Sequence, residues 1–292
     1  MALLAIIFSL ILEKFIYSIH KLRRIDWFIN FTKFIYTKFS DLKYWNDTFN
    51  VLVIIMVPVF TTAYIQYELD KLLAFFSFLF SIFILIVCIG PKDYQHIAHQ
   101  FLDARERGDE DGAQDLAKEL LQGSVPENDS DLIREINKVV LIEANERLFA
   151  VLFWFVLSGG PIGAVLYRLT SALREYTHEE VENIRPEFVL VSRLLYFILN
   201  WVPARLTAFS YAIIGSFVDA INQWKTHKSH ESMDPEGCDA LLTYMGFGAL
   251  NIDADKDVFT VDSIHAVLQL AKRSFFVWLT VLAIATLAGW AS

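Results

Sequence analysis

The sequence predicts an all-α, polytopic integral membrane protein. Of its 292 residues, 55% are hydrophobic and 25 are phenylalanine, and the mean hydropathy of +0.40 exceeds that of most soluble domains. Four apolar stretches reach the length of roughly 20 residues that a helix needs to cross a bilayer. We expect about four transmembrane helices, short re-entrant or interfacial helices and a cytoplasmic helical hairpin, all within a single domain of residues 1–292.

The chain opens on the apolar stretch MALLAIIFSLIL, which is too short to cross and predicts a short buried or re-entrant helix. Basic residues cluster between this stretch and the first long one. They are Lys14, Lys21, Arg23, Arg24, Lys33, Lys38 and Lys43. Because such residues mark the cytoplasmic side of membrane helices, the cluster indicates orientation and argues against nucleic acid as a partner.

The four long apolar stretches run from Val51 to Leu69, Leu72 to Ile89, Leu148 to Tyr167 and Phe275 to Ala291. Only the polar turn from Tyr67 to Lys71 separates the first two, so residues 51–89 are expected to form a transmembrane hairpin. The hairpin returns the chain to its starting side, which predicts a cytoplasmic location for residues 90–147.

Residues 90–147 form an acidic insert with local helix signals. In FLDARERGDEDGAQDLAKELLQG, Gly108 indicates a helix stop, Asp109 or Asp111 an N-cap, and Gly123 the end of a second helix. The segment therefore predicts a compact helical hairpin, whose acidic face offers a surface to a protein partner. GDEDG does not continue the alternating ligands of a calcium loop, so no calcium site is expected.

The third apolar stretch contains SGGPIG, which favours either a close helix contact of the GxxxG type at Gly159 and Gly163 or a kink at Pro161. SGGPIG lacks the Lys-Ser/Thr pair of a phosphate-binding loop. The core region of residues 148–218 continues with a longer apolar run from Phe188 to Phe217.

Pro203 interrupts this run, because a proline has no N–H and opposes continuation of a preceding helix. Asn200 is a favourable N-cap, and Pro203 falls in the first turn that it would cap, so we expect a break near Asn200 and a new helix after it. Small residues then recur every four positions and predict a helix packing face. They are Ala204, Ala208, Ala212 and Ser216.

Residues 219–274 are mostly polar, with one helix expected around Cys238 to Leu250 and another capped near Thr260 or Asp262. The last apolar stretch, residues 275–291, is the predicted C-terminal transmembrane helix. Lys272 and Arg273 directly precede this helix and indicate that it starts on the cytoplasmic side. Either residues 188–217 cross the membrane, or the third stretch turns back at SGGPIG. The sequence does not separate these alternatives.

Arg205 is the most informative single residue, since a guanidinium in or near hydrocarbon normally meets a carboxylate, backbone carbonyls or an anionic ligand. The candidate acids are Glu13, Glu143, Glu146 and Glu175. Two interpretations remain open, a structural ion pair and an anchor for a phosphate-bearing ligand.

Metal and cofactor chemistry has no clear signature. His96 with His99, and His227 with His230, have helical spacing but lack a HExxH motif or a cysteine pair beside them. No serine elbow, Cys-His pair or kinase signature is present in the sequence. We therefore expect no catalytic residue, no metal and no cofactor.

Three sequence blocks resemble the AmpE family of inner-membrane proteins, which is associated with induction of chromosomal β-lactamase in Gram-negative bacteria. They are RLFAVLFWFVLSGGPIGAVLYRL at 147–169, LNWVPARLTAFSYAIIG at 199–215 and AVLQLAKRSFFVWL at 266–279. The AmpE family in turn resembles the CobD/CbiB membrane proteins of cobalamin synthesis, which join an aminopropanol or its phosphate to a corrinoid carboxylate.

This chain departs from the CobD/CbiB pattern at its acids. The Asn-Thr-Leu-Asp stretch that follows Tyr-Arg is replaced by residues 169–173, and paired aspartates before the Asn-x-x-Pro-Ala-Arg block are replaced by Tyr196 and Phe197. Glu146 stands in for one acid before the Leu-Phe-Trp block. Amide formation needs carboxylate activation and stabilisation of developing charge, so these replacements argue against enzymatic activity.

The resemblance implies a multi-pass protein of the bacterial inner membrane that senses or modulates a signal linked to β-lactamase induction and cell-wall stress. We predict a polar pocket that binds an anionic small molecule, formed by Arg205, Asn200, Tyr167, Arg168, Glu13 and Glu146. The alternatives are an amide-forming enzyme of the CobD/CbiB class and a structural membrane partner protein. Membrane lipid is an expected partner, and the small-residue faces allow an oligomer.

Overall fold

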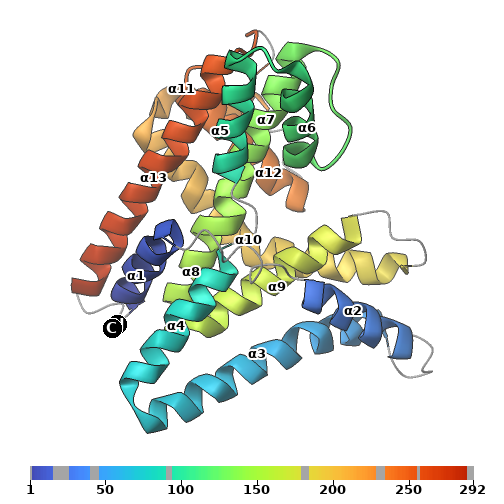
Figure 1. Cartoon of the computed structure of the whole chain (residues 1–292), viewed down its shortest axis with the longest axis vertical. Coiled ribbons are helices and arrows are strands. Elements are labelled where there is room, and N and C mark those ends of the chain that lie inside the picture. Colours follow the sequence, from blue (N-terminus) through green and yellow to red (C-terminus); the bar gives the residue numbers. More distant parts are fainter. Residues whose placement is uncertain are drawn as a thin grey trace. The chain divides into compact units, whose positions relative to one another are not determined.

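The computed structural model describes residues 2–15, 26–39, 46–89, 94–178, 184–227, 234–254 and 257–287, and α-helices dominate throughout these ranges (Figure 1). The described residues contain no strand, in agreement with the predicted all-α class. Most of the N-terminal basic cluster, together with His230 and the end of the predicted last crossing, lies outside the described residues.

The chain divides into two compact units. Unit 1 consists of residues 1–91, 150–201 and 281–292, and unit 2 consists of residues 92–149 and 202–280. Two long helices, α10 (Pro186–Ile214) and α13 (Val261–Leu287), belong partly to each.

Unit 1 is built around α9, with which α2, α3, α4 and α8 all pack. Its helices are α1 (Ala2–Phe15), α2 (Asp26–Phe39), α3 (Asp47–Leu72), α4 (Ala74–Cys88), α8 (Ala150–Leu157) and α9 (Pro161–His178), followed by the first part of α10. The opening stretch forms the short helix α1, which packs against α4.

The predicted hairpin of residues 51–89 is present as α3 and α4, but the turn is not at Tyr67 to Lys71 as expected. The helix continues to Leu72, and Leu73 alone, with an extended backbone, joins the two helices. The polar residues of the expected turn fit into the helix because their side chains contact one another along its surface. Lys71 contacts Glu68 at 3.1 Å and lies 3.9 Å from the centroid of the Tyr67 ring.

The stretch from Leu148 to Tyr167 is not one helix, so the prediction of a single crossing there is wrong. Helix α8 ends at Leu157, the chain turns at Gly159, whose φ is +72°, and a new helix, α9, begins at Pro161. Ser158 Oγ accepts the Gly163 N–H at 3.0 Å, which caps the new helix. A Cβ on Gly163 would collide with the carbonyl oxygen of Trp154, so this glycine permits the close approach of α8 and α9.

The break expected at Asn200 is also wrong, because α10 continues through Pro203 without interruption. A proline at 203 has no N–H to donate to the carbonyl of Leu199, four residues earlier. The indole Nε1–H of Trp154 instead donates to that carbonyl at 2.9 Å. The hydrogen bond that Pro203 cannot make is therefore replaced from a second helix, and Asn200 lies within α10 instead of capping a new helix.

Unit 2 contains α5 (Tyr94–Glu106), α6 (Glu110–Leu121) and α7 (Asp129–Ala144), which pack against one another. The predicted hairpin at Gly108 is confirmed, since Gly108 has a φ of +74° and the Asp109 side chain caps α6 by accepting the Gly112 N–H at 3.0 Å. The second helix ends two residues before Gly123, at Leu121, with Gln122 in the left-handed conformation.

Unit 2 also contains a π-helical segment, η2 (Asn145–Phe149), and the helices α11 (Phe217–Thr226) and α12 (Pro235–Ala249). α12 corresponds to the helix expected around Cys238 to Leu250. The final helix α13 begins at Val261, beside Thr260 as predicted, but it is continuous to Leu287. No separate helix starts at Phe275: the predicted last crossing, as far as Leu287, continues the helix that begins with the more polar residues after Val261.

The small-residue face of α10 is buried within unit 2, where Ala204, Ala208 and Ala212 are each at most 1% exposed. Packing of these three alanines was predicted from the spacing alone. Ser216, the fourth residue of the predicted face, lies beyond the end of α10 as the N-cap of α11 and is half-buried.

Three of the described helices are long and apolar enough to cross a membrane, by length and composition: α3, α10 and the Val261–Ile284 part of α13. The helices α1 and α4 contain shorter apolar segments. At 15 residues, α4 falls short of the usual crossing length, so the expected number of four transmembrane helices is supported only in part.

Candidate functional site

Two of the residues predicted for the polar pocket, Tyr167 and Asn200, meet inside unit 1. The hydroxyl of Tyr167 donates to Asn200 Oδ1 at 3.0 Å, and Asn200 Nδ2 donates to the hydroxyl of Tyr196 at 2.9 Å. All three side chains are 0% exposed. The result is a buried, uncharged hydrogen-bonded cluster, which we call the Tyr-Asn-Tyr cluster.

Helix geometry explains why these side chains meet. Tyr196 and Asn200 are four residues apart on α10 and therefore lie on the same face of the helix, while Tyr167 reaches them from α9. The guanidinium of Arg174, two turns after Tyr167 on α9, lies 4.4 Å from the centroid of the Tyr196 ring. A cation thus borders the cluster on the aromatic face of Tyr196.

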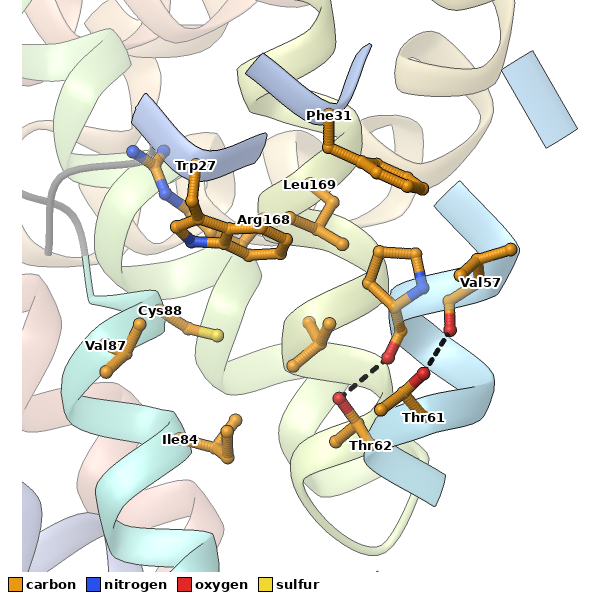
Figure 2. Close-up of a pocket in the computed structure, with 12 residues that line it drawn as sticks. Trp27, Phe31, Val57, Thr61, Thr62, Ile84, Val87, Cys88, Arg168 and Leu169 are labelled. Atoms are coloured by element: carbon orange, nitrogen blue, oxygen red, sulfur yellow. Dashed lines mark hydrogen bonds between the residues drawn. The ribbon is translucent and has the colours of Figure 1, made fainter. Parts of the chain in front are cut away.

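Arg168 follows Tyr167 directly in the chain, but its side chain lines a different part of unit 1. It is 4% exposed and contributes to the wall of a pocket of about 320 Å³ between α2, α3, α4 and α9 (Figure 2). The neighbouring wall includes Cys88, which is 3% exposed.

Unit 2 holds a second buried polar contact, between η2 and the later part of α10. Thr207 Oγ1 donates to Asn145 Oδ1 at 2.9 Å, and both residues are fully buried. The hydroxyl of Tyr211, one turn further along α10, donates to the carbonyl of Leu141 at 3.0 Å. The π-helical geometry at Asn145 alters the regular helix bonding, and Tyr211 supplies a donor from outside the helix.

The remaining predicted pocket residues do not join the Tyr-Asn-Tyr cluster as one described site. Arg205 and Glu146 are half-buried members of unit 2, whereas Asn200, Tyr167 and Arg168 belong to unit 1. Glu13 lies in α1, and its side chain is outside the described residues. The six-residue pocket therefore remains a prediction, of which the structure brings together one pair.

Glu143, a predicted partner of Arg205, forms an ion pair with Arg147 on the next turn. Arg147 is 5% exposed, so this is a nearly buried ion pair. The i,i+4 spacing of Glu and Arg was readable in the sequence and is a typical helical pairing.

Tyr196 and Asn145 were also not predicted as members of polar clusters. The sequence signal for Tyr196 is Asn200, which lies four residues later on the same helix and therefore on the same face. Asn145 also carries a signal, since a buried asparagine in a helix needs hydrogen-bond partners. The identity of Thr207 as its partner, 62 residues later, follows only from the fold.

The described residues contain no group of three His, Cys, Asp or Glu side chains arranged to hold a metal ion. Two of the histidines pack against rings. His227 stacks on Tyr244 at 4.0 Å between centroids with an interplanar angle of 10°, and His99 lies near His265. The buried clusters thus offer hydroxyl and amide groups, which hold helices in register and donate hydrogen bonds but supply no carboxylate pair.

Comparison with known proteins gives a match along almost the whole chain. Residues 1–291 match the family described as regulatory signalling modulator protein AmpE. The chain is 25% identical to Protein AmpE of Shigella flexneri over 211 residues, which is 70% of this chain and 72% of that protein.

Two cobalamin biosynthesis proteins named CobD are also similar. The one from Stutzerimonas stutzeri is 34% identical over 102 residues, which is 34% of this chain and 32% of that protein. The one from Chromobacterium violaceum is 29% identical over 144 residues, or 49% of this chain and 46% of that protein. The chain thus aligns with between about a third and a half of these two proteins. No solved structure matches.

The resemblance inferred from the three sequence blocks is therefore confirmed by a match that includes all three of them, together with both units of the structure. The helical, apolar architecture agrees with a bacterial membrane protein. This chain belongs to the AmpE family of regulatory signalling modulators.

Proposed function

We propose that this protein acts in the inner membrane as a modulator of β-lactamase induction and responds to an anionic ligand through Arg205. The observation that carries the proposal is a half-buried arginine on α10, a helix long and apolar enough to cross a membrane. A guanidinium in such surroundings is costly unless an anion or other acceptor meets it, and intramembrane cations commonly mark ligand sites.

The surroundings of Arg205 within unit 2 suit a responsive site. Thr207, on the next part of the same helix, is bonded to Asn145 of the π-helical segment, and that segment also carries Glu146. π-helical segments are rare and recur at functional sites. An anion that binds Arg205 would therefore contact α10, the helix that is hydrogen-bonded directly to η2.

The test compares Arg205→Ala with Arg205→Lys, which keeps the positive charge. Both variants replace the AmpE-family protein of a host whose β-lactamase is inducible, and β-lactamase activity is measured after exposure to an inducing β-lactam. We expect Arg205→Ala to lower induction by about tenfold, the equivalent of one lost charge-assisted hydrogen bond, and Arg205→Lys to retain most of it.

The matched control is Arg193→Ala, which removes a half-buried arginine from the unit 1 part of the same helix. Its induction should equal that of the unchanged protein. Immunoblots of the membrane fraction must show equal amounts of all variants. Unchanged induction in Arg205→Ala at an equal protein level would overturn the proposal.

A second candidate, an amide-forming enzyme like the CobD/CbiB class, is favoured by the 34% identity to a CobD protein over 102 residues. Against it, Tyr196 stands where that class carries an acid, and its hydroxyl accepts a hydrogen bond from Asn200. Purified protein incubated with nucleotide, a corrinoid acid and an amino alcohol distinguishes the two. Amide formation would support the enzyme, and its absence would remove this candidate.

A further inference from the structure

The pocket in unit 1 has an unusual combination of an apolar wall and one buried cation. Its twelve lining residues come from α2, α3, α4 and α9, and Figure 2 shows α2 across one side with α3 and α4 facing each other. The volume of about 320 Å³ is roughly twice the size of an apolar cavity that accepts benzene, which is about 150 Å³. There is room for a segment of hydrocarbon chain.

The threonines of the wall do not make the pocket polar. Thr61 Oγ1 donates to the Val57 carbonyl at 2.8 Å and Thr62 Oγ1 donates to the Pro58 carbonyl at 2.9 Å, so both hydroxyl protons are used within α3 (Figure 2). What the two threonines add to the pocket wall is therefore mainly the apolar surface of their methyl groups. Much of the rest is aliphatic or aromatic, including Phe31, Ile84 and Leu169.

Arg168 is the sole charged residue among the twelve that line the pocket, and no carboxylate is among them. In Figure 2 its guanidinium lies toward the side of the pocket where Trp27 is found, and Ile84 and Thr62 lie toward the opposite side. The pocket therefore has a cationic end and an apolar end. An occupant complementary to both carries a negative group on a hydrocarbon body.

The rim of the pocket belongs to surfaces that suit lipid. Val57 is 47% exposed and lies on α3, which has the length and composition of a membrane span, and Trp27 is 53% exposed on α2. α2 buries Phe28, Thr32 and Ile35 on one side. Its other side carries exposed aromatic and basic residues, the composition of a helix that lies in the membrane interface. They are Trp27, Lys33, Phe34 and Lys38.

We propose that this pocket binds an anionic amphiphile, a membrane lipid with a phosphate-bearing headgroup, with the headgroup at Arg168 and part of one acyl chain between α3, α4 and α9. Charge complementarity selects the headgroup, and the lipid-facing rim selects membrane lipid over a soluble anion. The site lies within unit 1 and does not involve Arg205, so it stands independently of the function proposed above.

The experiment uses the full chain reconstituted into vesicles of equal amounts of phosphatidylglycerol and phosphatidylcholine with identical acyl chains. The protein is re-extracted in detergent, and native mass spectrometry counts the retained lipids. We expect one phosphatidylglycerol retained in preference to phosphatidylcholine, and a loss of this preference by about tenfold in Arg168→Gln. Equal retention of both lipids by the unchanged protein would overturn the proposal.

Because loss of a buried arginine can disturb folding, a second variant acts at the rim. Val57→Trp fills the mouth of the pocket from an exposed position and should lower retention of phosphatidylglycerol severalfold. Leu52→Trp, at a 41% exposed position on α3 that does not line the pocket, is the matched control and should change nothing. Unchanged retention in Val57→Trp would exclude the pocket as the binding site.

Free sn-glycerol 3-phosphate, which has the headgroup charge without the acyl chains, distinguishes lipid from soluble anion. We expect it to leave the retained lipid in place at equal concentration. Displacement by glycerol phosphate would show that the anion alone suffices and would overturn the requirement for an amphiphile.

Discussion

At the scale of single residues, the Tyr-Asn-Tyr cluster shows how polar groups are accommodated in an apolar setting. Asn200 uses its amide oxygen and its amide nitrogen on two different tyrosines, one from α9 and one from its own helix. A buried donor or acceptor that loses its partner keeps the full cost of leaving water, because no solvent replaces the partner. Each of the two hydrogen bonds should therefore matter more than an exposed one.

Tyr167→Phe tests this expectation with a minimal change of shape. The variant removes the donor to Asn200 Oδ1 and should lower the free energy of unfolding by about 1–3 kcal/mol. Tyr64→Phe on α3 is the control, since Tyr64 is 65% exposed and should lose almost nothing. Denaturant unfolding of the protein in detergent, followed by circular dichroism, measures both. Equal midpoints for the two variants would contradict a stabilising role for the cluster.

The sequence placed Asn200 and Tyr167 in one polar pocket with Arg205. The structure shows these two side chains hydrogen-bonded to each other, and the pocket as a whole stays a prediction. The interpretation of Asn200 as an N-cap was wrong because it rested only on the neighbouring Pro203, and the helix continues through both residues. Of its two partners, Tyr196 lies four residues earlier on the same helix, a spacing that the sequence shows, whereas Tyr167 lies 33 residues away and no spacing rule identifies it.

At the scale of elements, α10 shows that a proline need not end a helix. Pro203 leaves the carbonyl of Leu199 without its helical donor, and the Trp154 indole supplies one from α8. The sequence predicts the missing hydrogen bond but not the group that replaces it. Conversely, the turn between α8 and α9 was suggested by SGGPIG as an alternative to a straight crossing, because glycine and proline signals are local.

A double-mutant cycle tests whether Trp154 and Pro203 are coupled. Trp154→Phe alone removes the donor and should cost about 1 kcal/mol beyond the lost indole packing. In the Pro203→Ala background the helix regains its own N–H, so the same change should cost about 1 kcal/mol less. Unfolding free energies of the unchanged protein, the two single variants and the double variant give the coupling. Strict additivity would show that the indole does not compensate for the proline.

At the scale of the whole molecule, neither compact unit is a continuous stretch of chain. Unit 1 draws on three segments and unit 2 on two, so long helices such as α10 contribute residues to both. Composition and apolar length predicted a helical membrane protein, and local caps predicted the hairpin at Gly108. The grouping into units depends on contacts between segments far apart in sequence, which periodicity does not encode.

The six-residue pocket predicted from the sequence takes residues from both units and stays a prediction. Arg205 and Asn200 are five residues apart on one continuous helix, and closeness in sequence suggested a common pocket. The division between the units falls at Trp201, so the two residues are assigned to different packing environments. A motif such as NWVPARL can therefore serve two environments at once, with its first residues in one unit and its last in the other.

The membrane topology gives the last prediction, and it depends on α4. A helix of 15 residues is about 22 Å long, which is less than the roughly 30 Å of the hydrocarbon core. To cross, α4 must therefore stand nearly perpendicular to the membrane plane, and the bilayer must thin locally around it. If α4 crosses, Asp70, near the corner between α3 and α4, faces the periplasm, and Asp111, in the acidic insert, faces the cytoplasm. Both positions are exposed.

Cysteine labelling decides between crossing and re-entry, because the two native cysteines, Cys88 and Cys238, are buried and should react little. A membrane-impermeant maleimide should label Asp70→Cys in spheroplasts and Asp111→Cys only in inverted vesicles. The basic residues before α3 favour this orientation. If both variants react from the same side, α4 returns without crossing, and the acidic insert is then not separated from the α3–α4 corner by the membrane.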